Sequence, residues 1–237
     1  MIELSVDPSA HRSFDMFAWA AALLAGWLVS RWRLADARQK FPRESGYVLA
    51  LGAGAIAGAY LAGALASLMR GAGSLSHSVA GALAGAILAV EIYKAARGIR
   101  GSTGAIFVAP FVVGLIIGRF GCLFAGLSDG TYGTLTPLPW GVDLGDGVAR
   151  HPVQVYESLS MLLFLGAYLE GLARRRNWAI KYGFYAMAIA YGAQRFLWEF
   201  LKPYPTIAGP FNIFHLISLG LVIYGCVWIA RARREVG

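Results

Sequence analysis

Tyr191, Arg195 and Glu199 have the residue types and the spacing for chemistry on a charged substrate. They follow one another every four residues, so on a helix they share one face that carries a phenol, a guanidinium and a carboxylate. The surrounding segment is apolar, and ionisable residues inside membrane spans usually mark a substrate path. The alternative is a buried ion pair between Arg195 and Glu199 that satisfies only itself.

A second arginine, Arg119, interrupts the apolar run from Ala109 to Gly126. A charged side chain at mid-depth in hydrocarbon costs about 2.5–3.5 kcal/mol or more, so Arg119 should face a protein interior, a water-filled cavity or an anionic ligand. The alternative is that it lies near the end of its span and reaches the headgroups. A guanidinium has the planar fork that suits phosphate.

Further candidates lie at the beginnings of two other apolar segments. The stretch ARHPVQVYE supplies polar side chains from Arg150, His151, Gln154, Tyr156 and Glu157. In SLSHSV, His77 offers an imidazole that could act as a base, with Ser76 as the helix cap. The alternative is structural: Arg150 and His151 as an interfacial anchor, and His77 as a hydrogen-bonded structural histidine.

Membrane helices must position these residues. The chain is 57% hydrophobic with a mean hydropathy of +0.57, whereas soluble domains are about 45–50% apolar. Seven segments suit the ~20 residues that ~30 Å of hydrocarbon requires, namely 14–31, 46–69, 77–93, 104–125, 155–173, 181–200 and 211–230. We therefore expect an all-α integral membrane protein with seven transmembrane helices, forming a single transmembrane domain over residues 1–237.

The positive charges predict the topology. Fifteen of the 21 Lys and Arg residues gather in alternate connections and in the tail: Arg31, Arg33, Arg38, Lys40, Arg43, Lys94, Arg97, Arg100, Arg174, Arg175, Arg176, Lys181, Arg231, Arg233 and Arg234. By the positive-inside rule the N-terminus is outside and the C-terminus is cytoplasmic. The net charge of +8 forms no basic patch or stripe, so we expect no nucleic-acid partner.

Other features of the chain follow from this topology. Gly and Ala recur at three- and four-residue spacing in the second and third segments, which predicts close helix packing. The connection 126–154 is long enough for a small outer cap. Cys122 and Cys226 lie toward opposite faces, so no disulfide is expected.

We expect at least two arginines, two histidines, two tyrosines and two glutamates from four segments to converge on one outer, partly intramembrane cavity. A lipid phosphate is the anion most available at that depth, and arginine suits it. The residue types therefore predict a phospholipid headgroup site, without distinguishing a transferase from a transporter or a receptor.

Five motifs, in order over roughly residues 72–220, resemble those of the prolipoprotein diacylglyceryl transferase family. SLSHSVAGALAG resembles its histidine-glycine segment, and GRFGCLFAG resembles its signature, which begins Gly-Arg-x-Gly-Asn. LPWG and RHPVQVYE are close to family forms, and YGAQRFLWEF matches Tyr-x-x-x-Arg-Phe-x-x-Glu-Phe. The first 60 residues match only in topology.

This resemblance implies a function. The family moves the diacylglyceryl group of phosphatidylglycerol onto a cysteine thiol of a lipoprotein precursor and releases glycerol phosphate. The resemblance implies a multi-pass enzyme of the bacterial inner membrane, with phosphatidylglycerol and a lipoprotein precursor peptide as partners. We expect no metal and no cofactor.

The resemblance also implies roles for individual residues. Arg119 and Arg195 stand where the family's arginines hold the lipid phosphate, and such cations stabilise charge on a leaving phosphate. His77 stands in the place of the histidine that helps to activate the thiol. Tyr191 and Glu199 flank Arg195 in its motif, with Glu199 placed to orient the guanidinium.

The chain departs from the family where the signature continues Gly-Asn-Phe-x-Asn-Gly-Glu. Cys122, Ala125 and Leu127 replace the two amides and the acid. Cys122 is either a thiol beside a phosphate-binding arginine or a small buried hydrophobe.

Two further departures lie elsewhere: Phe14-Asp15 stands for a Tyr-Gly pair, and His215 for a glutamine. These changes predict a chain that is slow, inactive on the usual substrate or adapted to another one. The alternative is a non-catalytic phospholipid-binding or lipid-moving membrane protein.

Overall fold

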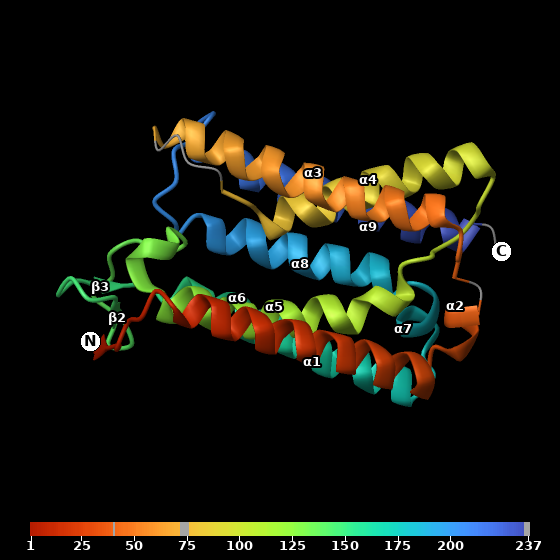
Figure 1. Cartoon of the computed structure of the whole chain (residues 1–237), viewed down its shortest axis with the longest axis horizontal. Helices are drawn as coiled ribbons and strands as arrows, with labels where there is room; N and C mark the ends of the chain where they lie inside the picture. The colour runs from red at the N-terminus through yellow and green to blue at the C-terminus, as the bar shows by residue number, and fades with distance from the viewer. Residues whose placement is uncertain (40, 72–75, 235–237) are drawn as a thin grey trace.

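The computed structural model describes residues 1–39, 41–71 and 76–234. Long helices run side by side along the molecule (Figure 1): α1 (Ala10–Trp32), α3 (Ser45–Met69), α4 (Val79–Arg97), α5 (Val108–Phe124), α6 (Val153–Ala173), α8 (Gly183–Glu199) and α9 (Ile213–Arg234). Shorter helices join them: α2 (Ala35–Gln39), η1 (Ala105–Phe107), η2 (Gly126–Asp129) and α7 (Asn177–Lys181). Lys40, Ser74 and Leu75, which belong to the sequence patterns above, lie outside the described residues.

Each of the seven segments expected to span a membrane overlaps one of the long helices over most of its length. Five helical segments of the described chain are long and apolar enough to cross a membrane, namely α1, α3, α4, η1 with α5, and α9. The α8 helix has only 17 residues and includes Arg195 and Glu199. The structure therefore supports a mostly helical protein with five candidate membrane-spanning helices.

Large apolar side chains point outward on several of these helices. Trp19 of α1 is 72% exposed, Leu49 of α3 is 70% exposed and Leu163 of α6 is 77% exposed. In a water-soluble protein such surfaces would be a liability. On helices of this length and composition they are suited to contact lipid chains.

Close packing of α3 against α4 depends on glycine. A Cβ atom on Gly58 would overlap the carbonyl oxygen of Gly81 and lie 2.8 Å from the Cα atom of Gly85. Small residues at such spacing let two backbones approach closely. The packing expected from the Gly and Ala pattern is confirmed.

The beginning of α4 corrects one expectation. Ser78, not Ser76, is the N-cap, and its hydroxyl accepts a hydrogen bond from the Gly81 amide at 3.2 Å. The Ser76 hydroxyl instead donates to the Gly63 carbonyl oxygen at 2.6 Å. This bond connects the residues just before α4 to the backbone of α3.

A small sheet ties the N-terminus to the connection between α5 and α6. It has the order β1 (Ile2–Glu3), β2 (Val142–Asp143) and β3 (Ala149–Arg150), with β1 parallel and β3 antiparallel to β2. Figure 1 shows β2 and β3 at the same end of the bundle as the N-terminus, at the end of α5. The sheet and η2 therefore gather at one end of the bundle.

Candidate active site

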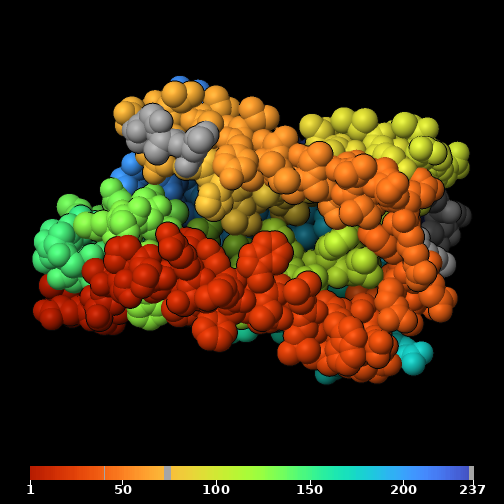
Figure 2. Space-filling view, viewed as in Figure 1, coloured from red at the N-terminus to blue at the C-terminus, as the bar shows by residue number. Residues whose placement is uncertain are grey.

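A cavity of about 880 Å³ lies between α1, α3, α4, α5 and α8. Figure 2 shows this face of the molecule hollowed between α3 and α4 on one side and α1 on the other. Most of the lining residues are apolar, and Arg119 and Arg195 are among the charged ones. Ligand sites are commonly cavities of about 300–1,000 Å³ with a few placed polar groups.

Arg119 is buried in the last turns of α5. Its side chain forms an ion pair with Glu157 of α6, which is 1% exposed. Arg119 is itself 7% exposed. The alternative in which Arg119 reaches out to the headgroups is therefore wrong.

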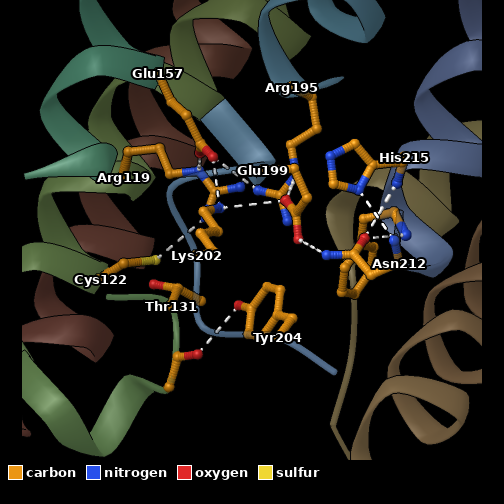
Figure 3. Close-up of polar contacts among 12 residues, drawn as sticks. Arg119, Cys122, Thr131, Glu157, Arg195, Glu199, Lys202, Tyr204, Asn212 and His215 are labelled. Carbon is orange, nitrogen blue, oxygen red and sulfur yellow. Dashed lines mark hydrogen bonds and ion pairs between the residues drawn. The ribbon is translucent and has the colours of Figure 1, made fainter. Parts of the chain in front are cut away.

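Arg195 of α8 reaches the same carboxylate from the other side (Figure 3). Its Nη1 atom donates to Glu157 Oε1 at 2.9 Å, and its Nε atom lies 3.1 Å from Glu199 Oε2. The predicted spacing of four residues thus does place Arg195 and Glu199 together. They are part of a larger cluster rather than an isolated pair.

Lys202 completes this cluster from the turn that follows α8. Its ammonium donates to Glu157 Oε1 at 2.6 Å and lies 3.8 Å from Glu199 Oε2. Burial, reinforced by the neighbouring charge of Arg195, lowers the pKa of Lys202 to about 8. Lys202 is therefore charged at neutral pH but close to losing its proton.

The charges of the cluster do not balance. Arg119, Arg195 and Lys202 are three buried cations, and among the described residues only Glu157 and Glu199 lie within ion-pairing distance of them. One positive charge is left over in a place where an uncompensated charge is costly. An anion bound at the cavity wall would neutralise it.

Asn212 and His215 hold the far side of the cluster. The Asn212 side chain donates to Glu199 Oε1 at 3.2 Å, and its backbone amide donates to His215 Nδ1 at 3.1 Å. The His215 ring packs among Phe196, Phe200 and Phe211. His215 therefore supports Asn212, and through it Glu199.

Two predicted residues are buried with unpaired polar atoms. Tyr191 is fully buried edge-on to Phe111, and its hydroxyl has no hydrogen-bond partner among the described residues. The same is true of both amide atoms of Gln154, at the start of α6. Buried polar groups normally have partners, so each keeps unused hydrogen-bonding capacity, although neither residue lines the cavity.

His77 lies just before α4 and lines the cavity together with Arg119 and Arg195. Its neighbour Ser76 is fixed to α3 by the bond to Gly63. The imidazole is therefore placed at the wall of the cavity that holds both arginines.

Arg150, His151 and Tyr156 have partners of their own outside the cavity lining. Arg150 binds Asp146 through two hydrogen bonds of 2.6 and 2.7 Å, and Arg150 holds the pKa of that carboxyl below its ordinary value. Tyr156 accepts a hydrogen bond from Trp140 at 2.9 Å, and His151 lies 3.4 Å from the Tyr156 hydroxyl. Arg150 thus pairs with Asp146, and Tyr156 pairs with Trp140 and His151, rather than converging with Arg119 and Arg195.

Cys122 does lie beside Arg119, with 4.0 Å between Nη1 and Sγ. Among the described residues, His11, Cys122 and Asp129 form the group whose donor atoms are close enough together to hold a metal ion. Of the other replaced positions, Ala125 is buried and Leu127 packs with the apolar residues beneath the small sheet.

The sequence analysis did not select Lys202, Asn212 or Arg70 as site residues. Arg70 lines the cavity, where its guanidinium lies 5.2 Å from the centre of the Tyr204 ring. The one available signal was the position of Lys202, three residues after Glu199. Asn212 and Arg70 carry no comparable pattern.

Comparisons with known proteins identify the family of the chain. A phosphatidylglycerol–prolipoprotein diacylglyceryl transferase of Geobacter sulfurreducens is 35% identical over 134 residues, 53% of this chain and 49% of that protein. Proteins of the same name from Finegoldia magna and Methylococcus capsulatus are 29% identical over 133 residues and 32% identical over 152 residues. These two matches cover 55% and 59% of this chain, and 51% and 55% of the relatives.

The chain thus spans about half the length of the curated relatives it matches. No solved structure matches it. The sequence model of the family described as prolipoprotein diacylglyceryl transferase, in contrast, matches residues 5–231. Because that match covers nearly the whole chain, the protein belongs to the prolipoprotein diacylglyceryl transferase family.

Proposed function

We propose that this protein transfers the diacylglyceryl group of phosphatidylglycerol to a cysteine thiol of a lipoprotein precursor or of a divergent acceptor. The bond between the diacylglyceryl carbon and the phosphate oxygen breaks, and glycerol phosphate leaves with the electron pair. A carbon–sulfur thioether bond forms, and the thiol proton passes to a base. The observation that carries this proposal is the buried cluster with one surplus positive charge at the wall of an 880 Å³ cavity.

In this proposal Arg119 and Arg195 bind the lipid phosphate, and Lys202 adds the charge that makes the cluster positive. The leaving phosphate gains negative charge in the transition state, so cations fixed beside it lower the barrier. Glu157 is a positioning residue, because it orients all three cations and is itself 1% exposed. Glu199 positions Arg195 in the same way.

His77 is proposed as the base that takes the proton from the acceptor thiol, since the thiolate is the nucleophile. It lines the same cavity as both arginines. The unpaired hydroxyl of Tyr191 and the amide of Gln154 are assigned to substrate oxygens. His215 acts indirectly: it holds Asn212, and Asn212 in turn holds Glu199.

The proposal includes the topology predicted from the sequence. All seven long helices would cross the bacterial inner membrane, with the N-terminus outside and the C-terminus in the cytoplasm. Residues 126–154 would form the small outer cap. The helical state of all seven segments and the unequal distribution of Lys and Arg support this arrangement. The hollow between α1 and α3 would admit the lipid from the side.

Purified protein supplied with phosphatidylglycerol and a lipobox peptide tests the proposal. We expect release of glycerol phosphate together with a gain of one diacylglyceryl mass on the peptide. Arg195→Ala should lower the rate by about 10²-fold or more, the cost of losing one charge-stabilising donor. Arg174→Ala is the matched control, because Arg174 is 64% exposed and pairs only with Glu170 of its own helix in the described chain.

The result that would overturn the proposal is an absence of product with any thiol acceptor, alongside binding of phosphatidylglycerol. That outcome would identify a phospholipid-binding protein without turnover. If Arg195→Ala reacts at the wild-type rate, the cluster around Glu157 has no part in the mechanism.

A further inference from the structure

We propose that His11, Cys122 and Asp129 form a binding site for one divalent metal ion of the zinc type. The three residues come from α1, from the last turns of α5 and from η2, which follows α5 directly. All three also line the cavity. The proposal concerns metal binding and does not depend on the transfer reaction.

The donor atoms lie close to the separations that a tetrahedral site requires. His11 Nε2 lies 3.0 Å from Asp129 Oδ1 and 3.8 Å from Cys122 Sγ, and all three donors lie within 4.8 Å of one another. Zinc bonds of about 2.0–2.3 Å at tetrahedral angles place two ligand atoms about 3.3–3.7 Å apart. Only small adjustments of the side chains would therefore be needed to enclose an ion.

The remaining polar atoms of two ligands are held as they are in known metal sites. His11 Nδ1 lies 2.9 Å from Asp15 Oδ2, and the Thr131 hydroxyl donates to Asp129 Oδ2. Metal-binding histidines usually donate their other ring N–H to a carboxylate, and metal-binding carboxylates accept hydrogen bonds of their own. Asp15 thus favours the proton on Nδ1, which leaves the Nε2 lone pair directed at Asp129 and Cys122.

That arrangement requires a positive charge, supplied either by a metal ion between the three donors or by a second proton on the His11 ring. A neutral His11 ring with its proton on Nδ1 would direct a lone pair at a carboxylate oxygen 3.0 Å away, which is repulsive. A metal ion between Nε2, Oδ1 and Sγ removes the repulsion. A doubly protonated ring would also remove it, and the experiment below separates the two.

The ligand types select the metal. One imidazole, one thiolate and one carboxylate form a mixed nitrogen, sulfur and oxygen set, which suits Zn²⁺ better than Mg²⁺ or Ca²⁺. The thiolate and the carboxylate together neutralise the charge of a dication. Three protein ligands leave a fourth position open, and all three ligands line the cavity.

The experiment uses the full chain in detergent, stripped of metal with a chelator and titrated with Co²⁺ and then Zn²⁺. We expect one equivalent of Co²⁺ to produce a thiolate-to-cobalt charge-transfer band in the near ultraviolet, which Zn²⁺ removes. Cys122→Ser should abolish the band and weaken Zn²⁺ binding at least tenfold. Asp15→Asn should weaken it by about 10- to 100-fold, as loss of the partner of a metal-binding histidine typically does.

Cys226→Ser is the matched control, because Cys226 is the exposed second cysteine and lies on α9. It should leave both the band and the affinity unchanged.

A folded wild-type protein with no charge-transfer band would overturn the proposal in favour of a protonated His11. A band that persists in Cys122→Ser would overturn it as well. Thermal unfolding of each variant checks the fold, and His11→Gln serves if Cys122→Ser does not fold. The readout is metal binding, so its failure would leave the proposed transfer reaction standing.

Discussion

At the scale of single residues, Glu157 holds the site together. Its two carboxylate oxygens form ion pairs with cations from three parts of the chain. Arg119 comes from α5, Arg195 from α8 and Lys202 from the turn after α8. Breaking one member of such a buried group typically costs several kcal/mol, since the remaining charge is left uncompensated. Binding an anion has the opposite effect here, because it neutralises the surplus charge.

We predict that Arg119→Lys weakens the binding of phosphatidylglycerol although it keeps the charge. Lysine lacks the planar fork that can hold Glu157 and a phosphate at the same time. Loss of one charge-assisted hydrogen bond costs about 1.5–3 kcal/mol, or about 10- to 150-fold in affinity. Titration of the purified variant with phosphatidylglycerol, with diacylglycerol as the phosphate-free comparison, measures the change. Equal phosphatidylglycerol affinity in variant and wild type would contradict the role of Arg119.

Lys202 gives the site a predicted pH dependence. Its pKa of about 8 lies below the ordinary value of lysine, so the ammonium is charged below that pH and neutral above it. The surplus positive charge is lost as pH rises through about 8, and the affinity for phosphatidylglycerol should fall over the same interval. Lys202→Arg should bind equally well on both sides of it, because arginine stays charged. A flat wild-type profile, or a falling profile in Lys202→Arg, would contradict this assignment.

The residue types in the sequence were sufficient to find most of the cluster. A charged residue in an apolar run must find partners, which singled out Arg119, Arg195 and Glu199. Arg150 lies outside the cavity lining, because Asp146, four residues earlier, binds it there. The group of His11, Cys122 and Asp129 escaped notice, since the approach of α1 to the end of α5 is a tertiary contact that no local pattern encodes.

At the scale of elements, the contact between α3 and α4 shapes one wall of the cavity. The two backbones meet at glycines on both helices, and α4 follows directly after His77. Any added volume at this contact must separate the helices. Such a shift would also move His77 relative to the arginines.

We therefore predict that Gly58→Ala destabilises the protein, whereas Gly52→Ala on the same helix does not. A Cβ atom at Gly58 would overlap the Gly81 carbonyl oxygen, and a Cβ atom at Gly52 would meet no other atom within 4 Å. Overpacking of this kind costs about 1–3 kcal/mol. Unfolding of the two variants in the same detergent measures the difference, and equal stability would count against the close packing of α3 and α4.

Hydropathy in the sequence predicted all seven long helices. It distinguished less well between helices that are apolar enough to cross a membrane and helices that are not. The α6 helix carries Glu157, and α8 carries Arg195 and Glu199, and these charged residues interrupt the apolar runs of the two helices. The cap of α4 was placed two residues too early because Ser76 and Ser78 are equivalent in the sequence. The bond of Ser76 to Gly63 on a neighbouring helix decides between them.

At the scale of the whole molecule, the helices surround a cavity that is apolar over most of its wall and positive at the cluster. An apolar cavity with an opening between α1 and α3 fits the chains of a lipid (Figure 2). The surplus cation at the cluster fits the phosphate of the same molecule. The two features together match an anionic phospholipid better than a neutral lipid or a soluble anion.

A structure of the protein with bound phosphatidylglycerol tests the central claim most directly. The account predicts the lipid phosphate within hydrogen-bond distance of both Arg119 and Arg195, with the acyl chains in the cavity and Glu157 still holding the two arginines. A phosphate bound elsewhere on the protein, with the cluster around Glu157 unchanged and without an anion, would contradict it.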